Sequence, residues 1–256
     1  MYKNRKKNVY FALLSTCTIF IRKMNIGCVS VIKNKSGLSF CITLNLHYIC
    51  QKKMMINDDV KSIIEKEADA VRNIPVTDAY ERAIEMIYEQ VHNLGGALIL
   101  SGMGKAGQIA MNTATTFSST GTPAYFLHPS EAQHGDLGIM RKNDILLLFS
   151  NSGKTRELEE LVSLSKGLVA DVKIMLITSN PDSPLAKEAD VFLLTGAPEE
   201  VCPLGLTPTT STTVMTVIGD MLVVGVMKKI GFTNVDYAKR HHGGYLGEKS
   251  RSQIRR

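Results

Sequence analysis

The sequence predicts an α/β domain of three layers, with about five parallel strands between two layers of helices. Short, uninterrupted apolar runs recur five times between residues 97 and 195, which is typical of strands covered on both faces. Helix-like segments separate these runs, as the crossover connections of parallel strands require. With 256 residues, 44% of them hydrophobic, the chain can bury such a core. Ligands bind at the carboxyl ends of strands in these sheets, so the loops after each run are the candidate sites.

The expected elements follow one another in a regular order. Apolar residues at helical spacing predict helices over 58–72 and 77–92, with Pro75 between them and Gly95-Gly96 after the second. The strands are expected at 97–100, 123–127, 144–149, 172–178 and 191–195. Helices are expected between them at 105–118, 155–168 and 184–188. A last helix, 208–230, is apolar almost all round, which is typical of a buried helix, and Gly231 suits its carboxyl end.

The positive charge of the chain is concentrated at its beginning. The sequence has a net charge of +6, but residues 1–53 hold ten Lys and Arg and no acid, which leaves 20 basic and 24 acidic residues after them. A net charge of −4 over 54–256 argues against a nucleic-acid partner. Residues 1–53 resemble a signal peptide without its small-residue cleavage site, or a transit peptide with the wrong composition. We expect an unstructured extension, or translation that starts at Met54 or Met55, followed by one domain over 54–256.

Apolar runs and cysteines bear on the compartment. No apolar run reaches the ~18–20 residues of a membrane-spanning helix, so no membrane association is expected. Four of the five cysteines lie in 1–53, and Cys202 alone follows. One cysteine in about two hundred residues is typical of a reducing compartment. We therefore expect a cytoplasmic protein with no disulfide framework and no cysteine-based metal site.

A glycine-rich loop follows the first strand. Residues 101–107 match the G-x-G-x-x-G pattern of dinucleotide-binding folds. The acidic residue that would bind the ribose is missing, because Phe126-Leu127-His128-Pro129 occupies its place. The better interpretation is a tight turn at a helix start, where Gly102 and Gly104 help to bind a phosphate monoester.

The loop after the third strand is rich in hydroxyl groups. Its tail Gly153-Lys154-Thr155 resembles the end of a P-loop, but Leu148 stands where a P-loop needs glycine. Side-chain donors before a helix start are instead suited to one phosphate group. The candidate ligands are Ser150, Asn151, Ser152 and Thr155. Alternatively, Ser152 or Thr155 only caps the helix.

Hydroxyls and titratable groups also occur near the end of the sheet. Residues 207–213 contain a run of Thr and Ser at the start of the long apolar helix, with Pro208 expected at its first position. Thr209 and Thr210 could close over a sugar phosphate, or could bond only to their own helix. The adjacent His241 and His242 make a poor metal pair, because neighbours in sequence do not face one ligand.

These motifs together resemble a known family. The segments GMGKAG, STGTPAYFLHPSEAQHGDLG, SNSG, CPLGLTPTTSTT and HHGGYLG, in this order over about 58–249, resemble the sugar isomerase (SIS) domain of the D-arabinose 5-phosphate isomerase family. The resemblance implies a flavodoxin-like five-stranded fold and a homo-tetramer. It also implies interconversion of D-ribulose 5-phosphate and D-arabinose 5-phosphate, which supplies 3-deoxy-D-manno-octulosonate (Kdo) for lipopolysaccharide or capsule.

The resemblance also assigns roles to individual residues. The important lysine of the family falls on Lys105, and the glutamate before Cys-Pro-Leu-Gly falls on Glu200. Its two histidines fall on His134 and His241, and the phosphate-loop serines are Ser150 and Ser152. Three departures accompany the match: Lys154 replaces a carboxylate, His242 replaces a proline, and the CBS-type regulatory modules of longer members do not follow.

We therefore expect an aldose–ketose isomerase that works through an enediolate without metal or cofactor. Glu200 is the expected base, with a pKa raised by burial. Lys105 would stabilise negative charge. His241, which a neighbouring subunit could supply at an interface site, would serve ring opening or proton transfer at oxygen. A non-catalytic phosphosugar-binding regulator is the alternative, because the fold does not fix the function. An isomerase of another phosphosugar is a further alternative.

Overall fold

The computed structural model describes residues 33–34, 37–38 and 46–254. The chain divides into two compact units, Met1–Val60 and Lys61–Arg256. In the first unit, β1 (Lys33–Asn34) pairs antiparallel with β2 (Gly37–Leu38). Helix α2 (Leu46–Arg72) runs from the first unit into the second. The expected extension over 1–53 falls largely outside the described residues, so its status stays a prediction.

The second unit is built on one sheet of five parallel strands. They are β3 (Leu98–Gly102), β4 (Ala124–Phe126), β5 (Ile145–Phe149), β6 (Lys173–Thr178) and β7 (Val191–Leu194). Their order is β4-β3-β5-β6-β7, and every pairing is parallel, which confirms the predicted fold class. The chain leaves β3 toward β4 on one side and returns to β5 on the other. The carboxyl ends of β3 and β5 therefore form the switch point at which such sheets bind ligands.

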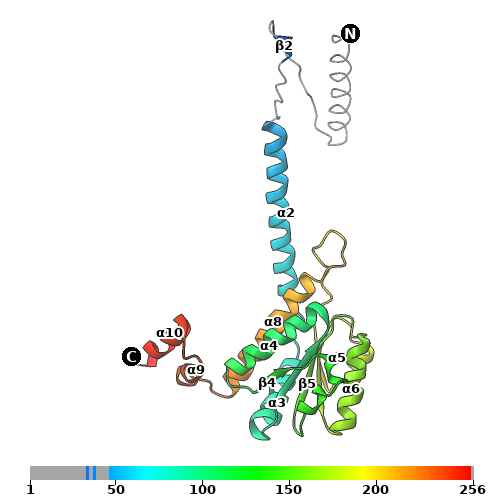
Figure 1. The fold of residues 1–256 in the computed structure, drawn as a ribbon, viewed down its shortest axis with the longest axis vertical. Helices are drawn as coiled ribbons and strands as arrows, with labels where there is room; N and C mark the ends of the chain where they lie inside the picture. The colour runs from blue at the N-terminus through cyan, green and yellow to red at the C-terminus, as the bar shows by residue number, and fades with distance from the viewer. Residues whose placement is uncertain (1–32, 35–36, 39–45, 255–256) are drawn as a thin grey trace, which may run out of the picture. The chain divides into compact units, whose positions relative to one another are not determined.

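Helices cover both faces of the sheet, as Figure 1 shows. One face packs against α3 (Ala79–Ile87), α4 (Gly104–Ser119) and α8 (Thr210–Lys229), and the other against α5 (Pro129–Ala132), α6 (Arg156–Leu168) and α7 (Pro184–Glu188). Alternate strand residues feed the two cores, because successive side chains point to opposite faces. Leu147 belongs to the first core, and Leu146 and Leu148 belong to the second. Both cores are mainly apolar and well buried, so they hold the loops above the sheet on a rigid base.

Helix α8 is the helix that the sequence predicted to be buried. By length and composition it could cross a membrane, so the expectation that no apolar segment reaches that length is wrong. Half of its apolar window is buried within the fold. It packs closely on α4, because a Cβ atom added at Gly219 would lie 2.7 Å from Thr113 Oγ1. The apolar character of α8 is thus accounted for by the core of the second unit.

Several boundaries differ from those predicted. Helix α8 begins at Thr210 rather than at Pro208, so the expectation that Pro208 occupies the first helical position is wrong. The helix α3 continues as a π-helical turn over Tyr88–Asn93. Four short elements were not predicted: α5, the 3-10 turn η2 (Asp136–Ile139), α9 (Asn234–Arg240) and α10 (Gly244–Ile254). These elements lack the long apolar periodicity on which the prediction relied.

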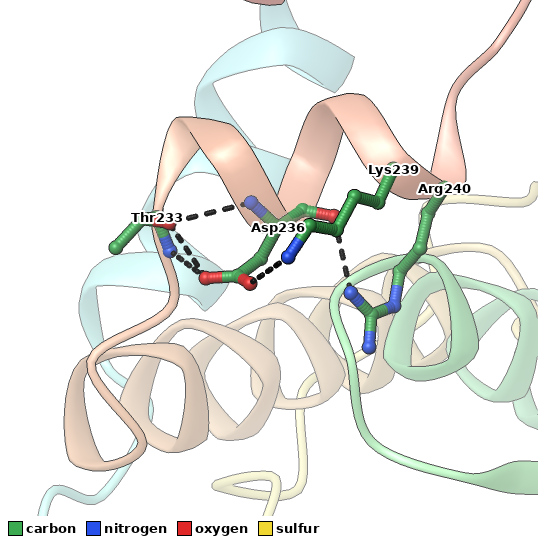
Figure 2. Close-up of polar contacts among 4 residues, drawn as sticks. All are labelled: Thr233, Asp236, Lys239 and Arg240. Atoms are coloured by element: carbon green, nitrogen blue, oxygen red, sulfur yellow. Dashed lines mark hydrogen bonds and ion pairs between the residues drawn. The ribbon is translucent and has the colours of Figure 1, made fainter. Parts of the chain in front are cut away.

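The C-terminal helices follow the far end of α8. Gly231 has φ +64°, which confirms it as the residue that ends α8. Helix α9 then begins with a capping box, in which Asp236 N donates to Thr233 Oγ1 and Thr233 N donates to Asp236 Oδ2 (Figure 2). A Cβ atom at Gly121, in the turn before β4, would contact Phe232 and Arg240. The start of α9 therefore lies at the amino ends of the strands, opposite the switch point.

Candidate active site

A pocket of about 630 Å³ lies at the carboxyl ends of the strands. Such a volume is typical of small-molecule sites. Its walls come from the loops after β3, β5 and β7 and from the start of α8. The lining residues include Met103, Lys105, Ser150, Asn151, Ser152, Thr155, Glu199, Glu200, Leu206, Ser211, Thr212 and Met215. The sheet topology thus brings together three loops that are far apart in the sequence.

The loop after β5 is braced by its own hydroxyls. Ser150 is buried, and its Oγ lies 2.9 Å from Thr155 Oγ1 and accepts from Gly153 N at 3.2 Å. Thr155 is the N-cap of α6, yet its side chain makes no capping hydrogen bond, so the simple capping alternative is not what the structure shows. Ser152 is exposed at the pocket wall. The first backbone N–H groups of α6 have no carbonyl partner in their own helix, which suits them to an anion.

Gly153 is needed for the shape of this loop. Its φ is +63°, and an added Cβ atom would lie 2.1 Å from Ser183 Oγ. A side chain is therefore excluded both by backbone conformation and by space. Asn151 follows the same pattern of anchoring, since its carbonyl oxygen accepts from Ser179 N and from Thr178 Oγ1. The Oδ1 atom of Asn151 is buried without a hydrogen-bond partner among the described residues, although the residue lines the pocket.

The glycine-rich loop after β3 serves the packing of α4. A Cβ atom at Gly107 would lie 2.4 Å from the carbonyl oxygen of Gly102, and Gly104 has φ +57°. The structure therefore gives Gly102 and Gly104 a backbone role, and neither lines the pocket. Their geometry starts α4 at Gly104 and places Lys105 in its first turn. Lys105 is exposed at the pocket wall and forms no ion pair with the residues that the structure describes.

Glu200 is fixed at the start of α8. Its Oε2 atom accepts from Thr209 N at 2.6 Å, from Thr209 Oγ1 at 2.9 Å and from Ser211 N at 3.3 Å. The glutamate thus satisfies N–H groups that no carbonyl of the helix can reach, and its charge is favourable at a helix N-terminus. The Oε1 atom of Glu200 has no hydrogen-bond partner in the described part of the chain. One oxygen is therefore held while the other is available to a ligand.

These contacts lower the pKa of Glu200. Burial raises it and is the largest single effect, but the hydrogen bonds from Ser211 and Thr209 together outweigh burial and hold the pKa below its ordinary value. The expectation of a raised pKa is therefore wrong. Glu200 stays ionised at neutral pH, so it can accept a proton, but it is a weaker base than expected.

Thr209 and Thr210 do not line the pocket themselves. Thr209 holds Glu200, and Thr210 is buried with its hydroxyl donating to Glu67 Oε1. The sequence missed Ser211 and Thr212, which line the pocket in the first turn of α8. The prediction started this helix at residue 208, which placed Ser211 and Thr212 one turn inside it. A start at Thr210 would have placed them at the open end of the helix, where they can face a ligand.

The two predicted catalytic histidines do not reach this pocket. His134 is exposed in the turn between α5 and η2 and does not line the pocket. His241 ends α9, where its ring stacks on Tyr237 with 3.7 Å between centroids. The pocket is at the start of α8 and α9 follows its end, and the 20 residues of α8 separate these ends by ~30 Å. His241 of this chain is therefore far from the pocket of the same chain.

Metal-ligating side chains and the thiol of Cys202 bear on two other kinds of site. Among the residues that the structure describes, no three His, Cys, Asp or Glu side chains gather closely enough to hold a metal ion. Cys202 lies just after Glu200, and its Sγ accepts from Thr207 N at 3.1 Å and from Leu206 N at 3.2 Å. These backbone hydrogen bonds lower the pKa of the Cys202 thiol to about 7, and the bond from Thr207 has the largest effect.

Comparison with known proteins agrees with this geometry. The SIS domain family model matches residues 96–225. Arabinose 5-phosphate isomerase KdsD of Yersinia pestis is 46% identical over 188 residues, which are 73% of this chain and 55% of that protein. KdsD of Escherichia coli K12 is 47% identical over 154 residues, which are 60% of this chain and 46% of that protein. The chain thus spans about half the length of the curated relatives that it matches.

Solved structures resemble the second unit over their whole length. A Bacteroides fragilis NCTC 9343 protein, whose assigned role is phosphosugar isomerisation in capsule formation, is 65% identical with a TM-score of 0.73, over 74% of this chain and 99% of that one. The E. coli CFT073 protein c3406, solved in complex with arabinose 5-phosphate, is 31% identical with a TM-score of 0.69, over 73% of this chain and 98% of that one. The family match, these structures and the pocket at the switch point lead to one conclusion: the chain belongs to the SIS domain family.

Proposed function

We propose that this protein interconverts D-ribulose 5-phosphate and D-arabinose 5-phosphate. The observation that carries this proposal is an ionised carboxylate, Glu200, held in a hydroxyl-lined pocket that also contains Lys105. Support comes from relatives that are 42–47% identical to this chain over the matched residues and are named for this activity, and from a similar structure in complex with arabinose 5-phosphate.

The reaction moves a proton between C1 and C2 of the open-chain sugar. Glu200 would take the proton from one carbon and return it to the other, so that an enediolate lies between the two steps. Lys105 would stabilise the negative charge that develops on the enediolate oxygens. Because Glu200 is a weak base, much of the rate would come from charge stabilisation and from the fixed position of its carboxylate.

The phosphate of the substrate would bind at the other end of the pocket. Ser152 and the first N–H groups of α6 offer donors there. Binding energy from this remote group orients the reacting carbons against Glu200. Lys154 is exposed beside the same loop, so it would strengthen the attraction for a dianionic phosphate.

A second copy of the chain would complete the site. His241 cannot reach the pocket of its own chain, so a role in ring opening requires that it enter the pocket of a neighbour. This supports a homo-oligomer, which we propose is a tetramer with active sites at subunit interfaces. The assigned capsule role of the Bacteroides relative supports use of the product in capsule formation. We propose that the product supplies Kdo for capsule or lipopolysaccharide and that the protein acts in the cytoplasm.

The test is conversion of D-arabinose 5-phosphate to D-ribulose 5-phosphate by the purified full chain, with a chelator present. Conversion that Glu200→Gln abolishes, while phosphosugar binding persists, would support the proposal. Glu65→Gln is the matched control, because Glu65 is an exposed carboxylate that does not line the pocket. Binding of the sugar phosphate with no conversion by the parent chain would reject it.

One alternative has its own support. A phosphosugar-binding regulator needs a pocket but no strong base, and both the lowered pKa of Glu200 and the cationic Lys154 are compatible with that role. The regulator predicts tight binding and no conversion by the parent protein. An isomerase of another phosphosugar predicts conversion of that sugar at a higher kcat/KM, so the assay should include pentose and hexose phosphates.

A further inference from the structure

A second carboxylate, Glu67 of α2, lies behind the start of α8. Its Oε1 atom accepts from Thr210 Oγ1 at 3.1 Å, and Thr210 is 1% exposed. The Oε2 atom of Glu67 is buried and has no partner among the described residues. Burying a carboxylate oxygen without a partner costs free energy, so this arrangement needs a compensating role.

The hydroxyl of Thr210 links Glu67 to the backbone beside Glu200. A carboxylate can only accept, so Thr210 must give its single hydroxyl proton to Glu67. The lone pairs of Thr210 Oγ1 are then available to accept from Val201 N, which lies 3.2 Å away. Val201 directly follows Glu200, so Glu67 orients the hydroxyl that accepts a hydrogen bond from the peptide unit next to Glu200.

Thr209 makes the matching contact from the other side. Its hydroxyl donates to Glu200 Oε2 at 2.9 Å, and the same oxygen accepts from Val201 N at 3.2 Å. Two carboxylates therefore orient two consecutive threonine hydroxyls around one backbone N–H. Loss of either contact would leave Val201 N–H with a single acceptor and let the side chain of Glu200 move relative to the pocket.

The end of α2 also holds this loop by direct packing. Gly196 has φ +78°, and a Cβ atom added there would lie 3.0 Å from the carbonyl oxygen of Asn73. A smaller cavity of about 290 Å³ separates α2 from the loop and is lined by Lys66, Asp69, Thr195 and Glu200 among others. Because a cavity leaves the loop partly unpacked here, its position depends more on the Glu67–Thr210 hydrogen bond.

We propose that Glu67 is a positioning residue for Glu200, acting through Thr210 and Val201. The inference rests on the proposed function, in which Glu200 moves the proton. Glu67 does not line the pocket and touches no reacting atom. Its effect is therefore on kcat, through the orientation of the Glu200 carboxylate. Misplacement of a reacting group by about 1 Å costs on the order of a hundredfold in rate.

The test compares four variants of the full chain. Glu67→Ala and Thr210→Val should each lower kcat by about ten- to a hundredfold, with KM changed by less than about threefold. Thr210→Ser keeps the hydroxyl and should restore most of the rate. Glu65→Ala, at an exposed position on the same helix, is the control and should match the parent. Valine has nearly the same shape as threonine, so Thr210→Val should fold. It therefore still tests the contact between Glu67 and Thr210 if Glu67→Ala does not fold.

A double-variant cycle separates positioning from general loss of stability. If Glu67 acts through Glu200, then Glu67→Ala should not lower the residual rate of Glu200→Gln any further. Additive losses, a kcat equal to that of Glu65→Ala, or an effect on KM alone would each overturn the proposal.

One readout does not need activity. The pKa of Glu200, followed by carbon-13 NMR of its carboxyl group, should rise toward its ordinary value in Thr210→Val, which changes no charge, and should not rise in Thr210→Ser. An unchanged pKa in Thr210→Val would overturn the positioning role. A parent protein that converts no sugar phosphate would instead overturn the proposed function, and the NMR result would still decide the role of Glu67.

Discussion

The hydrogen bonds on Glu200 predict how activity depends on pH. Thr209→Val removes the hydroxyl that donates to Glu200 Oε2 at 2.9 Å, while the N–H of residue 209, which donates at 2.6 Å, stays in place. A hydrogen bond to a charged group contributes about 1.5 kcal/mol at the low end of the measured range, which suits a half-buried site. Loss of this contribution of about 1.5 kcal/mol would destabilise the ionised form of Glu200, so its pKa should rise in this variant.

The assay is kcat/KM for D-arabinose 5-phosphate between pH 3.5 and 8. Its acid limb reports the essential base of the free enzyme. The limb should move to higher pH in Thr209→Val and should stay in place in Thr209→Ser, which keeps the hydroxyl. An acid limb that is unchanged or moves to lower pH in Thr209→Val would refute the reasoning, because the hydroxyl would then not stabilise the ionised form.

Four further predictions follow from the geometry. The lowered pKa of Glu200 means that its charge stabilises the fold above the ordinary pKa of glutamate, and that this contribution is lost as the pH falls through the pKa of the folded state. Glu200→Gln should therefore destabilise the protein at pH 7 and much less near pH 3, as measured by urea unfolding. Gly153→Ala should lower the free energy of unfolding by about 2 kcal/mol or more, whereas Gly167→Ala in α6, where a Cβ atom meets open space, should raise or preserve it. The alkylation rate of Cys202 by iodoacetamide, followed by peptide mass spectrometry, should have its midpoint at about pH 7. Lys105→Met should lower kcat roughly a hundredfold in the isomerase assay while leaving the melting temperature within about 2 °C of the parent, because Lys105 is exposed and makes no ion pair among the described residues.

The sheet could be predicted because buried parallel strands carry a strong local signal. The run 144–149 was expected to be a strand, and β5 occupies Ile145–Phe149 with every residue buried. The loops at the carboxyl ends of the strands could likewise be predicted as candidate sites, because parallel strands bring these loops to one edge of the sheet. By contrast, α9 and α10 are short and mostly exposed, so their apolar pattern is too weak to read.

The electrostatics of the site could not be predicted in the same way. The sequence places Glu200 before a Thr-rich helix start, but it does not say which group caps that helix. In the structure the Glu200 carboxylate accepts from the free N–H groups at the start of α8. Burial raises the pKa of Glu200, but these hydrogen bonds together lower it, and the sequence does not show them.

The anchoring of Glu200 has opposite effects on its position and on its basicity. Three hydrogen bonds on Oε2 fix the carboxylate, and the same bonds stabilise its charge and weaken it as a base. For a proton that moves between adjacent carbons, a fixed carboxylate can serve both C1 and C2 without a change of rotamer, and this favours rate through orientation. The lost basicity must then be offset by stabilisation of the enediolate, for which Lys105 is the cation that lines the pocket. Loss of Lys105 should therefore cost more in an enzyme with this anchored base than in one whose base is strong.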